Sequence, residues 1–163
     1  MNPFEILGLE PGTQIDEAEL ETRYLGLSRE YHPDFNQGLA ADEEVAMLTR
    51  SAELNDAYRL LRDPWSRAES TIRILDPSAM DKTKELSPMF LMDAMEARDE
   101  IEAASPDDWT NLKATVQQRV DQYFRDVSEH IADGNLREAA TLMHQSNYYR
   151  KSLRDLTDRI HTA

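Results

Sequence analysis

Apolar residues recur at helical spacing along most of the chain, and turn signals containing Pro or Gly separate the periodic stretches. Asp16, with Glu19 three residues later, is typical of a helix N-terminus, and Leu54, Ala57 and Leu61 fall on one face of a later helix. For the first half the pattern predicts a short opening segment at 4–9, a helix over 16–32, a long helix over 41–62 and a short helix over 65–75.

The second half begins with a stretch of different character. Residues 76–86 combine weak periodicity with turn formers, which is typical of a linker. After it, Ser87 with Pro88 predicts the start of a helix reaching about residue 104, and Gly134 separates two further amphipathic helices. Three helices joined by short loops favour an antiparallel bundle. We expect an all-α protein with domains at 1–75 and 87–163 and a linker at 76–86.

Charge and composition narrow the possible partners. The 163 residues include 32 acidic and 18 basic side chains, for a formal charge of −14, so we expect neither nucleic acid nor a membrane surface as a partner. The chain has no cysteine, which excludes disulfides and thiolate ligands. Its longest central apolar stretch is too short to span a bilayer, and its start lacks a basic targeting region. We expect a soluble cytoplasmic or matrix-type protein.

The most informative motif is Tyr31-His32-Pro33-Asp34, which lies between two predicted amphipathic helices. Pro33 cannot continue the first helix, so His32 and Asp34 are expected to stand in an exposed corner. A plain capping turn between two helices is the alternative interpretation. An enzyme site is a further alternative, but no nucleophile or metal-ligand spacing accompanies His32 and Asp34.

In order and spacing, this motif with the preceding helix and Leu54-Asn55-Asp56-Ala57-Tyr58 resembles the J-domain co-chaperones, and most closely their HscB/Jac-type branch. The stretch 90–102 resembles the signature helix of that branch, so the resemblance covers essentially the whole chain. It implies an N-terminal J-domain, built as an antiparallel helical hairpin with short helices, and a C-terminal three-helix bundle that binds a client.

The resemblance also implies partners and roles. A DnaK/HscA-type chaperone would dock on the loop and have its ATPase stimulated, and in this family the Asp of the tripeptide meets a chaperone arginine. The protein itself would not be an enzyme. The implied chaperone-binding residues are His32, Pro33, Asp34, Arg23, Tyr24 and Arg29. One departure is the weak basic track of the preceding helix, where Arg23 and Arg29 are the only cations.

The stretch 90–102 carries two apolar groups. Phe90, Ala94, Ala97 and Ile101 would face the bundle, whereas a second group lies beside that stripe. This second group is either part of a broad core face or the centre of a partner site with an acidic rim. The resemblance favours a site for an IscU-type iron–sulfur scaffold. The implied scaffold-binding residues are Leu91, Met92, Met95, Glu96, Asp99 and Tyr148.

Three alternatives remain open from the sequence. The protein could be a J-domain co-chaperone with a different client, or a helical adaptor without chaperone activity. Tyr148 and Tyr149 could form an ordinary core pair. We expect no cofactor and no metal site, and a monomer, with a dimer through the apolar patch near Met92 as the alternative.

Overall fold

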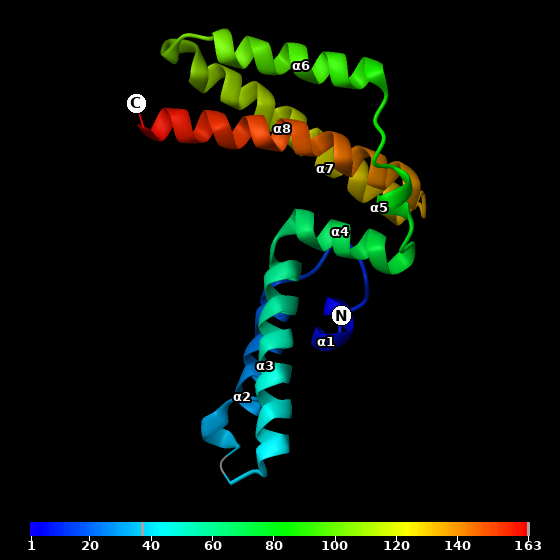
Figure 1. The fold of residues 1–163 in the computed structure, drawn as a ribbon, viewed down its shortest axis with the longest axis vertical. Coiled ribbons are helices and arrows are strands. Elements are labelled where there is room, and N and C mark those ends of the chain that lie inside the picture. Colours follow the sequence, from blue (N-terminus) through cyan, green and yellow to red (C-terminus); the bar gives the residue numbers. More distant parts are fainter. Residues whose placement is uncertain (37, 163) are drawn as a thin grey trace. The chain divides into compact units, whose positions relative to one another are not determined.

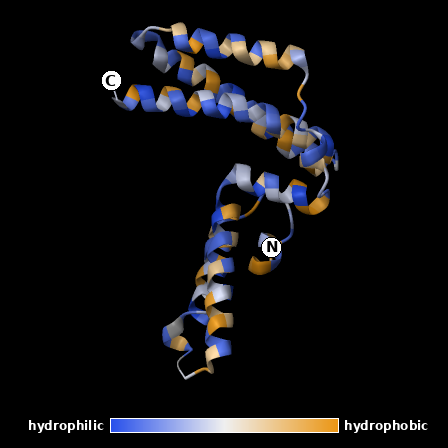
Figure 2. Ribbon diagram, viewed as in Figure 1, coloured by the Kyte–Doolittle hydropathy of each residue, from blue (hydrophilic) through white to orange (hydrophobic). Residues whose placement is uncertain are grey.

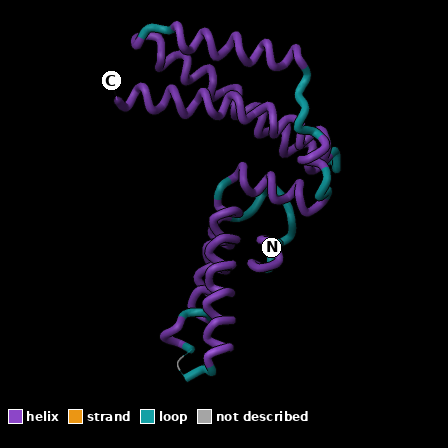
Figure 3. The backbone as a smooth tube through the Cα atoms, in the orientation of Figure 1, coloured by secondary structure: helices purple, strands orange, loops and turns teal. Residues whose placement is uncertain are grey.

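The structure is a computed structural model that describes residues 1–36 and 38–162. Its described residues form helices and loops with no strand (Figure 3), which confirms the prediction of an all-α fold. The chain divides into two compact units, Met1–Leu75 and Asp76–Ala163. None of the described helices is both long and apolar enough to cross a membrane.

The first unit is built around a helical hairpin. Helix α2 begins after Asp16, whose carboxylate accepts hydrogen bonds from the backbone N–H groups of Ala18 (2.9 Å) and Glu19 (3.3 Å). Helices α2 and α3 lie side by side in Figure 1. The elements of this unit are α1 (Pro3–Leu7), α2 (Glu17–Glu30), the 3₁₀ turn η1 (Pro33–Phe35), α3 (Ala41–Arg62) and α4 (Pro64–Leu75).

A small apolar core holds this unit together. Short helix α1 contributes Phe4 and Leu7, α2 contributes Leu20, and α3 contributes Leu54 and Leu61, all at most 1% exposed. Because α2 supplies only one fully buried side chain, most of its surface faces water.

Helix α4 is fastened to the end of α3 by a buried cation. Arg67 is 5% exposed, and its Nη1 donates a hydrogen bond to the carbonyl oxygen of Leu61 (3.1 Å). Burial lowers the pKa of Arg67, because desolvation opposes the charged form, while Glu17 and Asp63 act in the opposite direction. Asp63 also caps α4 by accepting a hydrogen bond from the backbone N–H of Ser66 (2.7 Å).

The segment 76–86 differs from the predicted linker. It contains helix α5 (Ala79–Lys82), which packs against α8, and Ala79 and Met80 are buried. The ring Nε2 of His144 on α8 lies 2.8 Å from the carbonyl oxygen of Met80 and donates to it. This segment therefore belongs to the second compact unit, and a four-residue helix is too short to produce a periodic pattern in the sequence.

The second unit is a three-helix arrangement of α6 (Pro88–Ala103), α7 (Trp109–Ala132) and α8 (Leu136–Thr162), with the 3₁₀ turn η2 (Pro106–Asp108) between α6 and α7. Ser87 caps α6 by accepting a hydrogen bond from the backbone N–H of Phe90 (3.2 Å). Gly134, with φ of 76°, makes the turn between α7 and α8 in a conformation that favours glycine. These helix positions follow the predicted pattern.

Helices α7 and α8 form the best-packed pair of this unit. Val127 on α7 and Ala139, Ala140 and Leu156 on α8 are fully buried. Helix α6 lies along this pair (Figure 1) but buries less: Ala94 and Ile101 are its only buried side chains among the described residues. Much of the apolar surface of α6 is therefore left facing solvent.

Candidate functional site

The loop between α2 and α3 is held in shape by local hydrogen bonds. The side-chain amide of Asn36 donates to the carbonyl oxygens of Glu30 (2.7 Å) and His32 (3.0 Å), and the backbone N–H of Phe35 donates to His32 O (3.0 Å). These bonds close the turn that Pro33 begins as the first residue of η1. The side chain of Pro33 lies outside the described part of the chain. The corner is thus a built turn rather than a loose connection.

Within this turn, His32 and Asp34 have distinct positions. The backbone N–H of Asp34 donates a hydrogen bond to Nδ1 of His32 (3.1 Å), so Nδ1 is the acceptor and the ring proton of the neutral imidazole lies on Nε2. The Asp34 carboxylate is 3.7 Å from the same nitrogen and its side chain is 79% exposed. His32 therefore shapes the turn, and Asp34 presents a negative charge to solvent.

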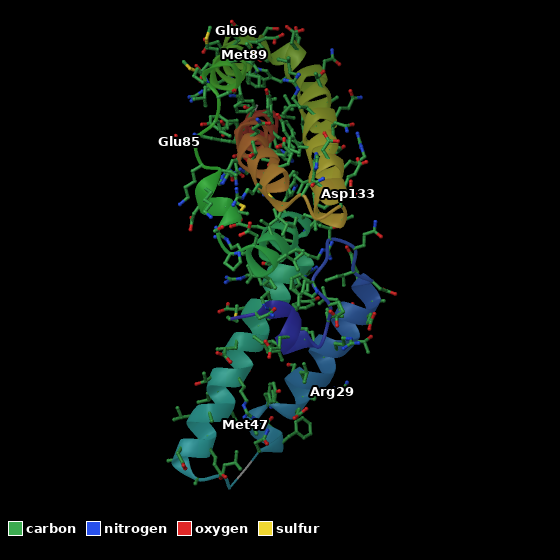
Figure 4. All side chains as sticks on the ribbon, turned by 90° about the vertical axis from the view of Figure 1, so that its right-hand side faces the viewer. Arg29, Met47, Glu85, Met89, Glu96 and Asp133 are labelled. Carbon is green, nitrogen blue, oxygen red and sulfur yellow. The ribbon has the colours of Figure 1, made fainter. Side chains whose placement is uncertain are left out.

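The other three predicted chaperone-binding residues lie on α2 and differ in their surroundings. Arg23 donates to the carbonyl oxygen of Gly8 (2.6 Å) and pairs with Glu19 (2.7 Å), so its guanidinium has partners within the first unit. Arg29 is exposed (Figure 4), and across residues 1–36 and 38–162 it forms no ion pair. Arg29 is therefore the cation of α2 that remains available to a partner.

Tyr24 is also tied to its own unit. Its ring stacks on Tyr58 of α3, with centroids 4.1 Å apart and planes inclined by 15°, and its hydroxyl donates to Oδ1 of Asn55 (2.9 Å). This cross-helix pair fixes the register of α2 against α3. Sequence spacing placed Tyr24 on the predicted helix, but only the structure shows that its hydroxyl is used internally.

The second candidate surface lies on α6. Met92 and Met95 are 63% and 65% exposed, and Leu91 is half-buried. Glu96 and Asp99 are exposed beside them, and Figure 4 labels Glu96 on this helix. Figure 2 shows that the hydrophobic positions of α6 lie mainly in its N-terminal half. The helix thus presents an apolar centre with carboxylates next to it.

Sequence reasoning missed one member of this surface. Met89 is 75% exposed and lies three residues before Met92, as Met92 lies three before Met95. Residues at this spacing follow one another along a helix face. The repeated three-residue spacing is visible in the sequence, but Met89 lies just before the stretch 90–102 on which the resemblance rests. We refer to Met89, Met92 and Met95 as the methionine stripe.

The two adjacent tyrosines of α8 have different environments. Tyr149 is 5% exposed, stacks on Tyr123 of α7 with centroids 5.6 Å apart, and accepts a hydrogen bond from Arg119 (3.0 Å). Tyr148 is 45% exposed, and the edge of its ring meets Phe90 of α6 at 5.6 Å. Tyr149 is therefore a core aromatic, whereas Tyr148 extends the α6 surface onto α8.

A groove borders the other flank of α6. It has a volume of about 670 Å³ and is formed by α6, α7 and α8, with Phe90 and Tyr123 among its apolar lining. Asp93, Glu96 and Glu100 line its α6 side. Burial raises the pKa of the Tyr123 hydroxyl, because desolvation opposes its ionised form. Glu96 thus lies between this groove and the methionine stripe.

The described residues show no grouping suited to metal binding: no cluster of three or more His, Asp or Glu side chains occurs in residues 1–36 and 38–162. His32 and Asp34 are both open to solvent and lie outside the lining of the groove around α6. Both candidate sites are exposed surfaces, one polar and centred on a turn, the other apolar and centred on a helix.

Comparisons with known proteins match both units. The DnaJ domain model matches residues 2–70, and the model described as the HSCB C-terminal oligomerisation domain matches residues 86–157. The "Co-chaperone protein HscB homolog" of Haemophilus ducreyi is 30% identical over 98% of this chain and 87% of its own length. The solved structure of chaperone HscB from Vibrio cholerae is 25% identical, with a TM-score of 0.80 over 98% of this chain and 99% of that chain. The human co-chaperone HscB structure, 22% identical with a TM-score of 0.85 over 100% of this chain and 84% of that chain, shares the fold.

Proposed function

Because the chain belongs to the HscB family of J-domain co-chaperones, which serve iron–sulfur cluster assembly, we propose that it joins two partners. The α6–α8 surface binds an IscU-type scaffold protein. The loop centred on Asp34 docks on a DnaK/HscA-type chaperone and stimulates its ATPase. The protein itself catalyses no reaction in this scheme, because the hydrolytic site belongs to the chaperone.

The exposed carboxylate of Asp34 is the observation that supports the chaperone contact. The surrounding turn is closed by hydrogen bonds from Asn36 and Phe35, so Asp34 meets a partner from a preformed position. Preorganisation reduces the ordering cost of association. A carboxylate held in this way suits the charge-assisted hydrogen bonds that an arginine of the chaperone donates.

Helix α2 adds one free cation to this contact. Arg29 lies in the last turn before the loop, and we propose that it contacts the chaperone together with His32, Pro33 and Asp34. Arg23 and Tyr24 hold α2 in place within the folded first unit, because their polar groups bond there and not to a partner.

The scaffold contact is supported chiefly by the exposure of the α6 side chains. Met92 and Met95 are more than 60% exposed in a helix whose opposite face is packed, which is the pattern of an interface centre and not of a core. Tyr148 is an aromatic of the kind enriched in interface hot spots. Glu96 and Asp99 supply the polar rim that surrounds such centres.

Asp34→Asn tests the chaperone half. The variant keeps the size of the side chain and removes its charge, so we expect the stimulated ATPase rate of the chaperone to return to its basal value while the helical circular dichroism of the co-chaperone is unchanged. Asp107→Asn is the matched control, because it removes one charge from an exposed position in the other unit. Equal stimulation by Asp34→Asn and the wild type would contradict the proposal, and absence of stimulation by the wild type would favour an adaptor.

Calorimetric titration with an IscU-type scaffold, without chaperone, tests the other half. The triple variant Leu91→Ala/Met92→Ala/Met95→Ala should lose about 2–4 kcal/mol of binding free energy, or about 30- to 1000-fold in affinity, if these residues form the hot spot.

The matched control for that titration is a second triple variant in the first unit, Leu25→Ala/Val45→Ala/Leu48→Ala. Its three side chains are 48%, 63% and 53% exposed, so it removes comparable apolar surface. Equal losses in both variants would show a nonspecific effect. A folded wild type that stimulates the chaperone but does not bind the scaffold would indicate a J-domain co-chaperone with a different client.

A further inference from the structure

The methionines of this chain fall into distinct environments. Met89, Met92 and Met95 are 75%, 63% and 65% exposed, whereas Met80 and Met143 are 3% and 2% exposed. The three exposed thioethers occupy successive positions three residues apart on a single helix. Two of them, Met92 and Met95, are side chains that we place at the centre of the scaffold contact, and all three are open to small dissolved reagents.

Thioethers have a reaction that Leu, Ile and Val lack. A hydroperoxide transfers one oxygen atom to the sulfur: the S–O bond forms, the O–O bond breaks, and methionine with hydrogen peroxide yields methionine sulfoxide and water. The sulfur is oxidised and the peroxide is reduced. The product is a polar, hydrogen-bond-accepting side chain on the same backbone. The reaction needs access to the sulfur, which the methionine stripe provides and Met80 and Met143 do not.

We propose that the methionine stripe of α6 is an oxidation-sensitive switch, in which hydroperoxides convert Met89, Met92 and Met95 to sulfoxides and thereby weaken the binding of the scaffold. This inference rests on the proposed function of the α6 surface. Its physical basis is that an interface buries its central side chains, and a sulfoxide buried without a donor loses its hydrogen bonds to water.

The switch is confined to one face of one unit. The packing of α7 against α8 relies on Val127, Ala139 and Leu156, whose side chains cannot form sulfoxides, and the one methionine in that core, Met143, is 2% exposed. Oxidation of the stripe therefore leaves the bundle folded. It also leaves the charge and the turn geometry at Asp34 unchanged. Peroxide therefore weakens scaffold binding and leaves chaperone stimulation as it was.

The conversion is reversible in chemical terms. Methionine sulfoxide reductases restore the thioether: the S–O bond breaks, the oxygen leaves as water with the protons of two thiols, and the two thiols are oxidised to a disulfide. One enzyme class acts on each sulfoxide epimer. Because this chain has no cysteine, no thiol of its own competes for the peroxide. The state of the stripe thus depends on the balance between external hydroperoxide and external thiol.

The experiment begins with the full chain treated with hydrogen peroxide, which catalase then removes before any partner is added. Peptide mass spectrometry should show that Met89, Met92 and Met95 gain oxygen at least about tenfold faster than Met80 and Met143. Calorimetric titration with the IscU-type scaffold should then show affinity reduced by at least about tenfold, and treatment with both reductases and a dithiol should restore it. Chaperone ATPase stimulation without scaffold should stay unchanged.

A variant carrying Met89→Leu, Met92→Leu and Met95→Leu identifies the sulfur as the cause. Its scaffold affinity is measured before and after peroxide treatment, and the ratio of these two affinities should be close to one. Met1 and Met47 are retained in it, so any effect of their oxidation appears there as well. An equal loss of affinity in this variant would overturn the proposal.

The remaining outcomes separate this inference from the proposed function. Failure of the untreated wild type to bind the scaffold refutes the scaffold contact, and the switch with it. Binding by the untreated protein that survives full oxidation of the stripe refutes the switch alone. Oxidation of Met80 and Met143 as fast as that of the stripe would show that peroxide unfolds the bundle, which also overturns the proposal.

Discussion

Replacing Arg23 by Gln tests whether this cation supports the fold of the first unit or contacts the chaperone directly. Its Nη1 lies 2.6 Å from the carbonyl oxygen of Gly8 and 3.3 Å from that of Leu7, at the C-terminal end of α1. Gly8 has a φ of 64° and ends α1 in a left-handed conformation. Arg23 thus closes α1 onto α2 through two otherwise open carbonyls.

The magnitude follows from these contacts. A hydrogen bond from a charged donor contributes about 1.5–3 kcal/mol, and a surface pair such as Arg23–Glu19 about 0.3–0.5 kcal/mol. Because the Arg23 side chain is 40% exposed, the lower part of that range applies. We expect Arg23→Gln to lower the unfolding free energy of the first unit by about 1.5–2 kcal/mol. For a unit of this size the loss corresponds to a Tm lower by about 6–16 °C.

The assay uses the tryptophans, one in each unit. Trp65 lies on α4 of the first unit and Trp109 on α7 of the second, so a Trp109→Phe background lets the fluorescence of Trp65 report unfolding of the first unit alone. Urea and thermal unfolding then give the free energy and Tm. Chaperone ATPase stimulation is measured well below the lowered Tm, where we expect Arg23→Gln to retain it.

Arg29→Gln is the matched control, because it removes the same charge from an exposed position on the same helix. We expect its unfolding free energy to stay within about 0.5 kcal/mol of the wild type and its ATPase stimulation to fall. The reasoning is refuted if Arg23→Gln abolishes stimulation with no change in stability, since its guanidinium would then act on the chaperone and not on α1.

Three further outcomes are expected. Gly26→Ala should raise the unfolding free energy of the first unit by about 0.5–1 kcal/mol in urea titrations, because a Cβ there meets no atom within 4 Å; a loss of stability would reveal a contact that the structure lacks. Tyr24→Phe should cost about 0.5–1.5 kcal/mol, and a double-mutant cycle with Asn55→Ala should assign that cost to their hydrogen bond; additive effects would disprove the coupling. The carboxyl pKa of Asp76 is lowered because the side chain and backbone N–H of Ser78 donate to it. This contribution is present above the ordinary aspartate pKa and lost as pH falls through the lowered value, so Ser78→Ala should raise the pKa of Asp76 in a carbon-detected NMR titration, and an unmoved pKa would contradict the assignment.

Much of the fold was predictable because the signals that start and stop helices are local. Asp16 and Ser87 cap helices through backbone groups two or three residues away, and Gly134 turns the chain within one residue. Such interactions are complete within a short stretch, so the sequence displays them directly. Helix α5 escaped prediction because it has only four residues and its packing partner, α8 with His144, lies far along the chain.

Some features of the candidate sites were likewise predictable from the sequence alone. The order of residues alone identified the turn at His32 and Asp34, because proline interrupts a periodic helix there, and it located the apolar excess on 90–102. The sequence also determined the net charge and the absence of thiols, which depend on composition alone. These features require no knowledge of which segments meet.

Tertiary structure decided which of those residues face a partner. Arg23 and Arg29 have the same side chain on the same helix, yet only Arg23 has carbonyls of α1 within reach. Tyr148 and Tyr149 are adjacent, yet α7 covers only Tyr149. Helical periodicity states which residues share a face, whereas exposure depends on how closely other helices pack on that face. Helix α6 buries few of its side chains against α7 and α8, and for that reason its apolar residues form an exposed surface.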